Sequence, residues 1–171
     1  MNVNVLCVSS GESVAARITK PGKLVLPSLN DGWRFNFHKH ARKKGCETYV
    51  LVCDDSPDII EGCLVFQMKN STEPYMAFVE VAPHNKGKQK ALDNVAGCLI
   101  AFACQLSFVY GKDHFRGWLA FDVKEHRKED EVKLMAVYCI KYGALPWGDT
   151  TMFIPPEKGK DLIAKFLTPV L

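Results

Sequence analysis

One segment of the sequence carries residue types that could bind a phosphate group. The strand-like run Tyr75–Val81 leads into a loop with several lysines and Gly87, and an apolar helix is expected to begin near Asn94. The first turn of a helix offers backbone N–H groups without intrahelical partners, together with the positive end of the helix dipole. This order of strand, loop and helix favours anion binding. The alternative is a solvated basic loop that only caps a core helix.

The loop does not match the two common nucleotide-binding motifs. Gly87-Lys88 is followed by Gln89, whereas a Walker A loop requires Ser or Thr after the lysine and a further glycine upstream. The glycine spacing also excludes the dinucleotide-binding fingerprint. A phosphate bound here would therefore depend on main-chain N–H groups and on the nearby lysines.

Glu80 is a candidate general base in the strand that precedes this loop. By strand alternation it shares a face with Met76, Phe78 and Ala82, which predicts an apolar setting that favours the protonated carboxyl group. Such a carboxyl group can take a proton from an attacking amine. The alternative is a structural glutamate that pairs with a lysine.

The histidine and cysteine patterns predict no metal site. His38 and His40 flank Lys39, but no further histidine or cysteine follows at zinc-ligand spacing. The seven cysteines include no C-x-x-C pair and lie mostly in apolar runs, which predicts reduced thiols in the core.

The candidate residues would be positioned by one α+β domain that spans residues 1–171. Runs rich in β-branched and aromatic residues predict strands, and apolar residues at helical spacing predict helices. The predicted strands are 33–38, 48–53, 63–68, 75–81, 117–123 and 151–154, and the predicted helices are 93–110, 129–142 and 159–167. The helix 93–110 is apolar on all sides, which predicts a buried helix whose Gly97, Ala101 and Ala103 lie close to the sheet.

Composition and charge indicate an ordinary globular protein. Hydrophobic residues make up 47% of the chain and the net charge is +3, so neither nucleic acid nor a membrane surface is an expected partner. The longest apolar run, 95–104, is too short to cross a bilayer. We therefore expect a cytoplasmic protein. The basic cluster between Arg34 and Lys44 is interpreted as a solvated face or as a patch for an acidic acceptor.

Two motifs around the loop resemble a known family signature. Val81-Ala82-Pro83 matches a strand end of form V-x-P, and Asn94-Val95-Ala96 stands where a loop of form [Q/R]-x-x-G-x-[G/A] ends. Asn94 replaces the first glycine of that loop, and Ala91 replaces its Gln or Arg. Together with Y-C-I-K-Y-G-A near the C-terminus, these motifs resemble the GNAT superfamily, the Gcn5-related N-acetyltransferases, and in particular bacterial members of unassigned acceptor.

The resemblance implies a mixed, mostly antiparallel sheet, flanked by helices and splayed at its fourth strand, with acetyl-CoA in the gap. The pantetheine would pair with the strand, and the pyrophosphate would bind the backbone of the loop and the lysines near it. The cofactor contacts implied for this sequence are Val81, Ala82, Lys86, Lys88, Lys90, Asn94, Val95, Ala96 and Gly97. The family also often places an acid on this strand, as Glu80 is placed here.

A tyrosine in the predicted helix 129–142 is the second catalytic candidate. Helical spacing predicts a buried stripe on this helix, with Tyr138 opposite the middle of it. The stripe consists of Val132, Met135, Ala136, Cys139 and Ile140. In the GNAT family this helix commonly supplies a tyrosine hydroxyl that protonates the departing thiolate. The resemblance assigns that role to Tyr138, with Tyr142 as the fallback.

These observations predict an acetyl-CoA-dependent N-acetyltransferase that transfers an acetyl group to a primary amine by direct attack. The acceptor would be a small-molecule or peptide amine, and a homodimer is compatible with the sequence. The alternative is a catalytically inactive GNAT-like module that binds acyl-CoA or another protein, because Ala91 and Asn94 depart from the phosphate-loop pattern.

Overall fold

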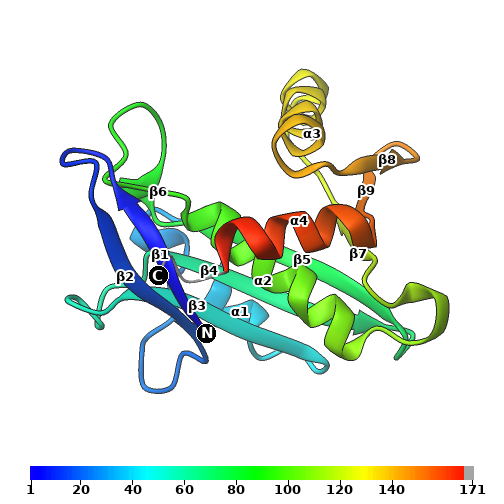
Figure 1. The fold of residues 1–171 in the computed structure, drawn as a ribbon, viewed down its shortest axis with the longest axis horizontal. Coiled ribbons are helices and arrows are strands. Elements are labelled where there is room, and N and C mark those ends of the chain that lie inside the picture. The colour runs from blue at the N-terminus through cyan, green and yellow to red at the C-terminus, as the bar shows by residue number, and fades with distance from the viewer. Residues whose placement is uncertain (168–171) are drawn as a thin grey trace.

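Strands and helices follow one another in α+β order in the computed structural model, which describes residues 1–167 (Figure 1). The strands are β1 (Asn2–Cys7), β2 (Ser13–Thr19), β3 (Cys46–Cys53), β4 (Gly62–Lys69), β5 (Glu73–Val81), β6 (Leu92–Asp93), β7 (Leu119–Asp122), β8 (Leu145–Trp147) and β9 (Thr151–Ile154). The helices are α1 (Phe37–His40), α2 (Val95–Tyr110), α3 (Lys128–Tyr142) and α4 (Pro156–Phe166), with short 3-10 turns at Leu29–Asp31, Pro83–Asn85 and Asp113–Phe115.

The described strands form one mixed sheet in the order β6-β1-β2-β3-β4-β5-β7-β9-β8. Its neighbouring strands pair in antiparallel fashion, except that β5 and β7 run parallel and pair at one position, Tyr75 with Ala120. This sheet, flanked by helices, confirms the predicted fold class. The strand predicted at 75–81 is the fourth in the predicted order but the fifth, β5, in the structure. This is because β1 and β2 precede the predicted strands and residues 33–38 do not form a strand.

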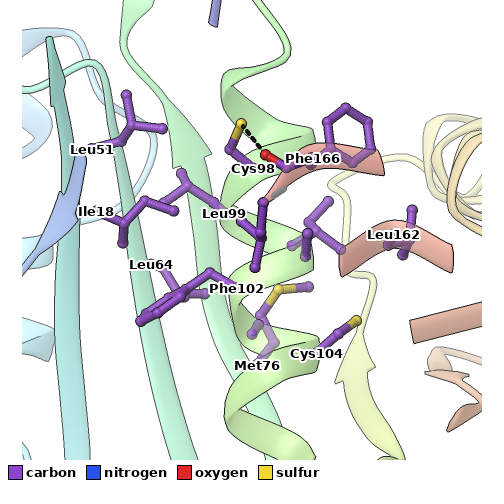
Figure 2. Close-up of a cluster of buried hydrophobic side chains, with 14 of the residues drawn as sticks. Ile18, Leu51, Leu64, Met76, Cys98, Leu99, Phe102, Cys104, Leu162 and Phe166 are labelled. Carbon is purple, nitrogen blue, oxygen red and sulfur yellow. Dashed lines mark hydrogen bonds between the residues drawn. The ribbon is translucent and has the colours of Figure 1, made fainter. Parts of the chain in front are cut away.

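Each face of the sheet has its own apolar core. On one face α2 and α4 cover the central strands (Figure 1), and their side chains pack against Leu51, Leu64 and Met76 of the sheet (Figure 2). On the other face, Trp33 and Phe37 belong to a second buried cluster over β3, β4 and β5. These strands are therefore covered on both sides, which explains the continuous apolar runs in β3 and β4.

Two glycines hold the first half of α2 close to its neighbours. A Cβ atom on Gly62 in β4 would lie 2.7 Å from Leu99 Cδ1 and 2.9 Å from Val95 Cγ1. A Cβ atom on Gly97 would lie 2.5 Å from the ring of Phe166. Gly97 therefore allows close packing against α4, not against the sheet as the sequence predicted. The predicted burial of α2 is confirmed, and no helix of residues 1–167 is long and apolar enough to cross a bilayer.

The strand predicted at residues 33–38 is wrong. Phe37 begins the short helix α1, and the Asn36 side chain accepts a hydrogen bond from Lys39 N at 2.9 Å as its N-cap. Trp33 and Phe37 are both buried, and their rings meet edge to face at 5.7 Å. The alternating aromatic residues thus fill a core beneath a loop and a helical turn, because burial in a compact loop can produce the same local pattern as a strand.

The orientation predicted for α3 is also wrong. Val132 is 56% exposed and Ile140 is 87% exposed, although both belong to the predicted buried stripe, of which Met135 and Cys139 do pack against the core. The helix instead turns Tyr138 and Tyr142 toward the body of the protein, where the Tyr138 ring lies 4.8 Å from that of Phe121. Burying two aromatic side chains removes more apolar surface from water than burying two β-branched ones, so the helix rotates toward the tyrosines.

Replacement of Gly97 by alanine is predicted to lower the free energy of unfolding by about 1–3 kcal/mol, because the added methyl group overlaps the Phe166 ring. Urea unfolding would measure this change. Gly159→Ala in α4 is the matched control, since a Cβ atom there meets its nearest neighbour at 3.5 Å and alanine favours a helix. Equal stability of the two variants would contradict the close packing of α2 and α4.

Candidate functional site

The sheet opens between β5 and β7, and this opening is the centre of the candidate site. After Tyr75 and Ala120 the two parallel strands share no further pair, so their C-terminal halves diverge. A cavity of about 90 Å³ lies between them. This opening cavity is lined by residues 76–79 of β5, residues 121–125 in and after β7, residues 34–35, and Leu134 and Tyr138 of α3.

A β-bulge shapes the β5 wall of the opening. Val65 pairs with Phe78 and Phe66 with Met76, so Ala77 is an extra residue in β5. At the bulge, the alternation of β5 side chains between the two faces of the sheet is shifted by one residue. Met76 therefore lies in the core beneath α2, whereas Phe78 belongs to the cluster on the opposite face. The prediction that Met76 and Phe78 share a face is wrong for this reason.

The C-terminal half of β5 has a free hydrogen-bonding edge toward the opening. Ala82 N donates to Glu61 O at 2.8 Å, on the β4 side, and Ala82 O accepts from Asn85 N at 2.8 Å. Because alternate residues of a strand direct their N–H groups to opposite sides, Val81 and Val79 direct theirs toward the opening. An extended amide-containing ligand can therefore pair with Val81, while both backbone groups of Ala82 are already bonded within the chain.

The N-terminus of α2 forms a second part of the site. The first hydrogen bond of this helix runs from Cys98 N to Asn94 O at 2.9 Å. The N–H groups of Val95, Ala96 and Gly97 have no acceptor within residues 1–167. They face a cavity of about 120 Å³, which we call the loop cavity. This cavity offers three backbone donors at the positive end of a 16-residue helix.

Asn94 adopts the left-handed conformation at the start of this helix, with φ 69° and ψ 0°. Glycine favours this region because it has no Cβ, and asparagine tolerates it better than most other residues. The replacement of the first loop glycine by Asn94 therefore keeps the backbone geometry that a glycine would provide.

The lysines near the loop have three different settings. Lys90 lines the loop cavity and pairs with Asp93 at 2.8 Å, and Lys141 of α3 lines the same cavity from the other side. Lys86 instead forms an ion pair with Glu80, and Lys88 is exposed. The structure thus brings one of the three predicted lysines to the loop cavity. Sequence reasoning missed Lys141, because it lies almost 50 positions from Asn94 and meets it only through the fold.

A buried asparagine fixes the loop between β5 and α2. Asn85 Oδ1 accepts from Leu92 N at 3.0 Å, and Asn85 Nδ2 donates to Glu61 Oε2 at 2.7 Å. His84 Nε2 bonds to the same carboxylate oxygen at 2.5 Å. The loop that presents Lys90 is therefore attached at both ends to buried polar groups, which holds the loop cavity in shape.

Glu80 is buried and fully engaged in hydrogen bonds. Its carboxylate accepts Arg34 N at 2.8 Å and Phe35 N at 3.1 Å, and it pairs with Lys86. The expected apolar setting is not found, because three donors surround the two oxygens. In this arrangement Glu80 fixes the segment that carries Arg34 and Phe35 against β5, and this segment forms one wall of the opening cavity.

Arg34 spans the opening on the face opposite α2. Its guanidinium pairs with Glu125 and donates to Lys124 O at 2.7 Å, just after the end of β7. The segment anchored on β5 by Glu80 is thus linked across the opening to the chain after β7. No signal in the sequence predicted the ion pair between Arg34 and Glu125, because the two residues are far apart along the chain.

Tyr138 lines the opening cavity from α3. The hydroxyl has no hydrogen-bond partner among the described residues, and burial raises the pKa of Tyr138 to about 12. The phenol is therefore protonated at neutral pH and can donate. Tyr142 lies behind it, at 5.8 Å between ring centroids, and lines neither the opening cavity nor the loop cavity.

Asp122 is a further acidic residue of the opening cavity that the sequence did not single out. Tyr75 Oη donates to its carboxylate at 2.5 Å, and Thr151 Oγ1 does so at 2.7 Å. Burial alone would raise the pKa of Asp122, but hydrogen bonds from Tyr75, Thr151 and Thr150 lower it below its usual value. An ionised carboxylate at this place can attract a cationic amine toward the opening.

Comparisons with known proteins identify the fold. No protein-family profile and no curated protein matches the sequence. Similar solved structures include the KacTA–DNA complex (11% identity over 88% of this chain and 99% of the other, TM-score 0.59) and AtaTR bound with acetyl-CoA (14% identity over 86% and 98%, TM-score 0.55). A mutant AtaT toxin bound to the C-terminus of the antitoxin AtaR is also similar (12% identity over 86% and 96%, TM-score 0.55). The chain therefore has a GNAT-like fold, the fold of acetyltransferases such as AtaT and KacT.

Replacement of Glu80 by glutamine is predicted to lower the free energy of unfolding by about 1–3 kcal/mol, because a buried backbone N–H and the Lys86 ammonium lose their charged acceptor. Chemical unfolding followed by circular dichroism would measure the change. Glu47→Gln is the control, because that glutamate also pairs with a lysine but is exposed. If Glu80→Gln is as stable as the control, Glu80 does not anchor the 34–35 segment.

Proposed function

We propose that this chain is an acetyl-CoA-dependent N-acetyltransferase that transfers an acetyl group to a primary amine by direct attack. The observation that carries this proposal is the position of the opening between β5 and β7, which holds Tyr138 in its wall and lies beside the unpaired N–H groups at the start of α2. The AtaTR structure, which shares the fold, contains acetyl-CoA.

The two cavities fit the two chemically different parts of acetyl-CoA. The loop cavity supplies the N–H groups of Val95, Ala96 and Gly97 together with Lys90 and Lys141, which suits a diphosphate. Val79 and Val81 present a free strand edge, which suits the amide groups of pantetheine. The predicted contacts at Val81, Lys90 and residues 94–97 therefore remain part of the proposal, whereas Lys86 and Ala82 would act by supporting the loop and strand.

Bound acetyl-CoA would supply a thioester, whose carbonyl carbon bonds to the amine nitrogen while the carbon–sulfur bond breaks. Tyr138 would donate its hydroxyl proton to the leaving sulfur. Two observations support this role: Tyr138 lines the opening cavity, and its hydroxyl has no other partner among the described residues. Asp122 attracts the cationic acceptor from the face opposite α2. The amine must lose a proton before it attacks. Water would accept that proton, and Glu80, whose oxygens already accept three donors and which lines neither cavity, would take it only through water.

The rival function is a GNAT-like module that binds acyl-CoA or a protein without catalysis. The left-handed conformation of Asn94 argues against a degraded phosphate loop, since the main-chain donors after it are still exposed to the loop cavity.

A cytoplasmic location, a homodimer and the absence of a nucleic-acid partner stay predictions. KacTA is known from a complex with DNA, and AtaT from a complex with part of an antitoxin.

Acetyl-CoA at about a hundred times its Kd is predicted to stabilise the fold by about 2.7 kcal/mol. For a chain of this size the melting temperature would rise by roughly 5–10 °C. Differential scanning fluorimetry and calorimetry would measure both effects.

The variant Lys141→Gln should weaken acetyl-CoA binding by about three- to tenfold, because it removes a charge beside the loop cavity. Lys133→Gln on the exposed side of the same helix is the control and should bind normally. No binding of acetyl-CoA at millimolar concentration would rule out both the transferase and the cofactor-binding module.

Tyr138→Phe is predicted to bind acetyl-CoA normally and to lower kcat at least about tenfold, because a positioned acid acts only in the transition state. The control is Tyr142→Phe, whose hydroxyl lies outside both cavities. Steady-state rates with an amine acceptor and calorimetric Kd values would be compared. A full rate for Tyr138→Phe together with a low rate for Tyr142→Phe would move the acid to Tyr142.

A further inference from the structure

A large aromatic groove lies on the sheet face opposite α2, at the β7-β9-β8 end. Its volume is about 560 Å³, and its aromatic lining includes Trp118, Trp147, Phe153 and Phe115. Trp147 is 71% exposed and Trp118 is 38% exposed, which is unusual for the largest apolar side chain. Aromatic surface of this extent that stays in contact with water indicates a binding site.

Three of the rings come from neighbouring parts of the sheet and face one space. The Phe153 ring lies 5.2 Å from that of Trp118 and 5.9 Å from that of Trp147, at interplanar angles of 54° and 64°. Phe153 pairs with Ala120 of β7 and with Leu145 of β8, so the tryptophans flank it on both sides. The inclined rings therefore form a box whose π-faces can surround a cation.

The charged group of the groove is also suited to a cation. Glu73 lines the groove, and its Oε1 accepts Asn70 Nδ2 at 3.1 Å, while its Oε2 has no donor among the described residues. No lysine or arginine within residues 1–167 lines this groove; the histidine in its lining, His114, packs on the Phe115 ring at 4.1 Å between centroids. On the adjoining part of the face, the Lys69 ammonium lies 3.5 Å from the centroid of the Tyr75 ring, so a cation already uses an aromatic ring there.

The groove adjoins the opening cavity through one hydrogen bond. Thr151 lines the groove, and its hydroxyl donates at 2.7 Å to Asp122, which lines the opening cavity. A ligand seated beside the tryptophans would therefore have one end near Thr151, whose hydrogen-bond partner Asp122 belongs to the opening cavity. This order of carboxylate, aromatic box and second carboxylate fits an elongated molecule with two positive groups.

We infer that the aromatic groove binds an organic cation, and that it holds the second cationic group of an amine acceptor whose first amino group enters the opening. The inference about the acceptor rests on the proposed acetyl transfer, whereas cation binding by the groove does not. The acceptor class is thus a diamine or a longer polyamine, held by Trp147, Trp118 and Phe153 around one ammonium group and by Glu73 beside it.

The first test measures binding of choline to the full chain by calorimetry, without acetyl-CoA. Choline cannot be acetylated on nitrogen, and 3,3-dimethylbutan-1-ol is its uncharged isostere. We expect choline to bind more tightly than the isostere, and Trp147→Leu and Glu73→Gln each to weaken choline binding by about tenfold. Tyr110→Leu and Glu12→Gln, which change an exposed tyrosine and an exposed glutamate elsewhere, should leave it unchanged.

The second test compares diamines from three to eight carbons with monoamines of the same length as acceptors. We expect a lower KM for the diamine whose length joins the groove to the opening, and Trp147→Leu and Glu73→Gln should remove this advantage while leaving acetyl-CoA affinity unchanged. Equal choline and isostere affinities would overturn the cation site. Choline binding with no diamine advantage would overturn the acceptor assignment. Choline binding in a chain that does not bind acetyl-CoA would leave the cation site in place and contradict the transferase.

Discussion

The close seating of the first turn of α2 is the constraint on which the rest of the site depends. The N–H groups of Val95, Ala96 and Gly97 have no hydrogen-bond partners within residues 1–167. Their position is set by the packing of α2 against β4 on one side and against α4 on the other. Gly62 lets Val95 and Leu99 approach β4, and Gly97 lets the Phe166 ring of α4 close over the same turn. The donors are therefore held by the apolar core itself, so an anion bound there meets a prearranged set of dipoles and need not order a loop.

A buried carboxylate supplies the second organising contact. Moving the Glu80 charge out of water is costly, and the cost is offset by two backbone N–H donors and by the Lys86 ammonium. These donors come from the 34–35 segment and from the loop after β5, so one side chain ties both to the strand that borders the opening. Arg34 then carries this attachment across to Glu125 beyond β7. The two strands are thus linked by side chains in the region where they share no backbone pairs.

Local sequence patterns predicted the strand, loop and helix of the site, because these features depend on neighbouring residues. The strand 151–154 and the helix 93–110 were likewise found close to their predicted bounds. The failures arose where distant residues decide the outcome. The bulge at Ala77 depends on the register with β4, the rotation of α3 depends on the packing of Tyr138 against Phe121, and the contact of Lys141 with the loop cavity depends on where α3 lies. None of these partners is adjacent in sequence, so periodicity carried no signal for them.

The departures of the phosphate loop from the family pattern also change meaning when the geometry is considered. Asn94 was, together with Ala91, the argument for a lost function, yet the φ of 69° at Asn94 is the conformation that a glycine would provide at this position. Asp93 introduces a negative charge beside the expected phosphate, because the hydrogen bond from Lys90 holds its pKa below the usual value. The charge of Lys90 offsets that of Asp93, and Lys141 faces the same cavity. Two lysines against one aspartate leave the loop cavity with a net positive charge. The sequence has therefore changed the residues of the loop while keeping the two properties that a diphosphate needs, which are unpaired donors and a positive field.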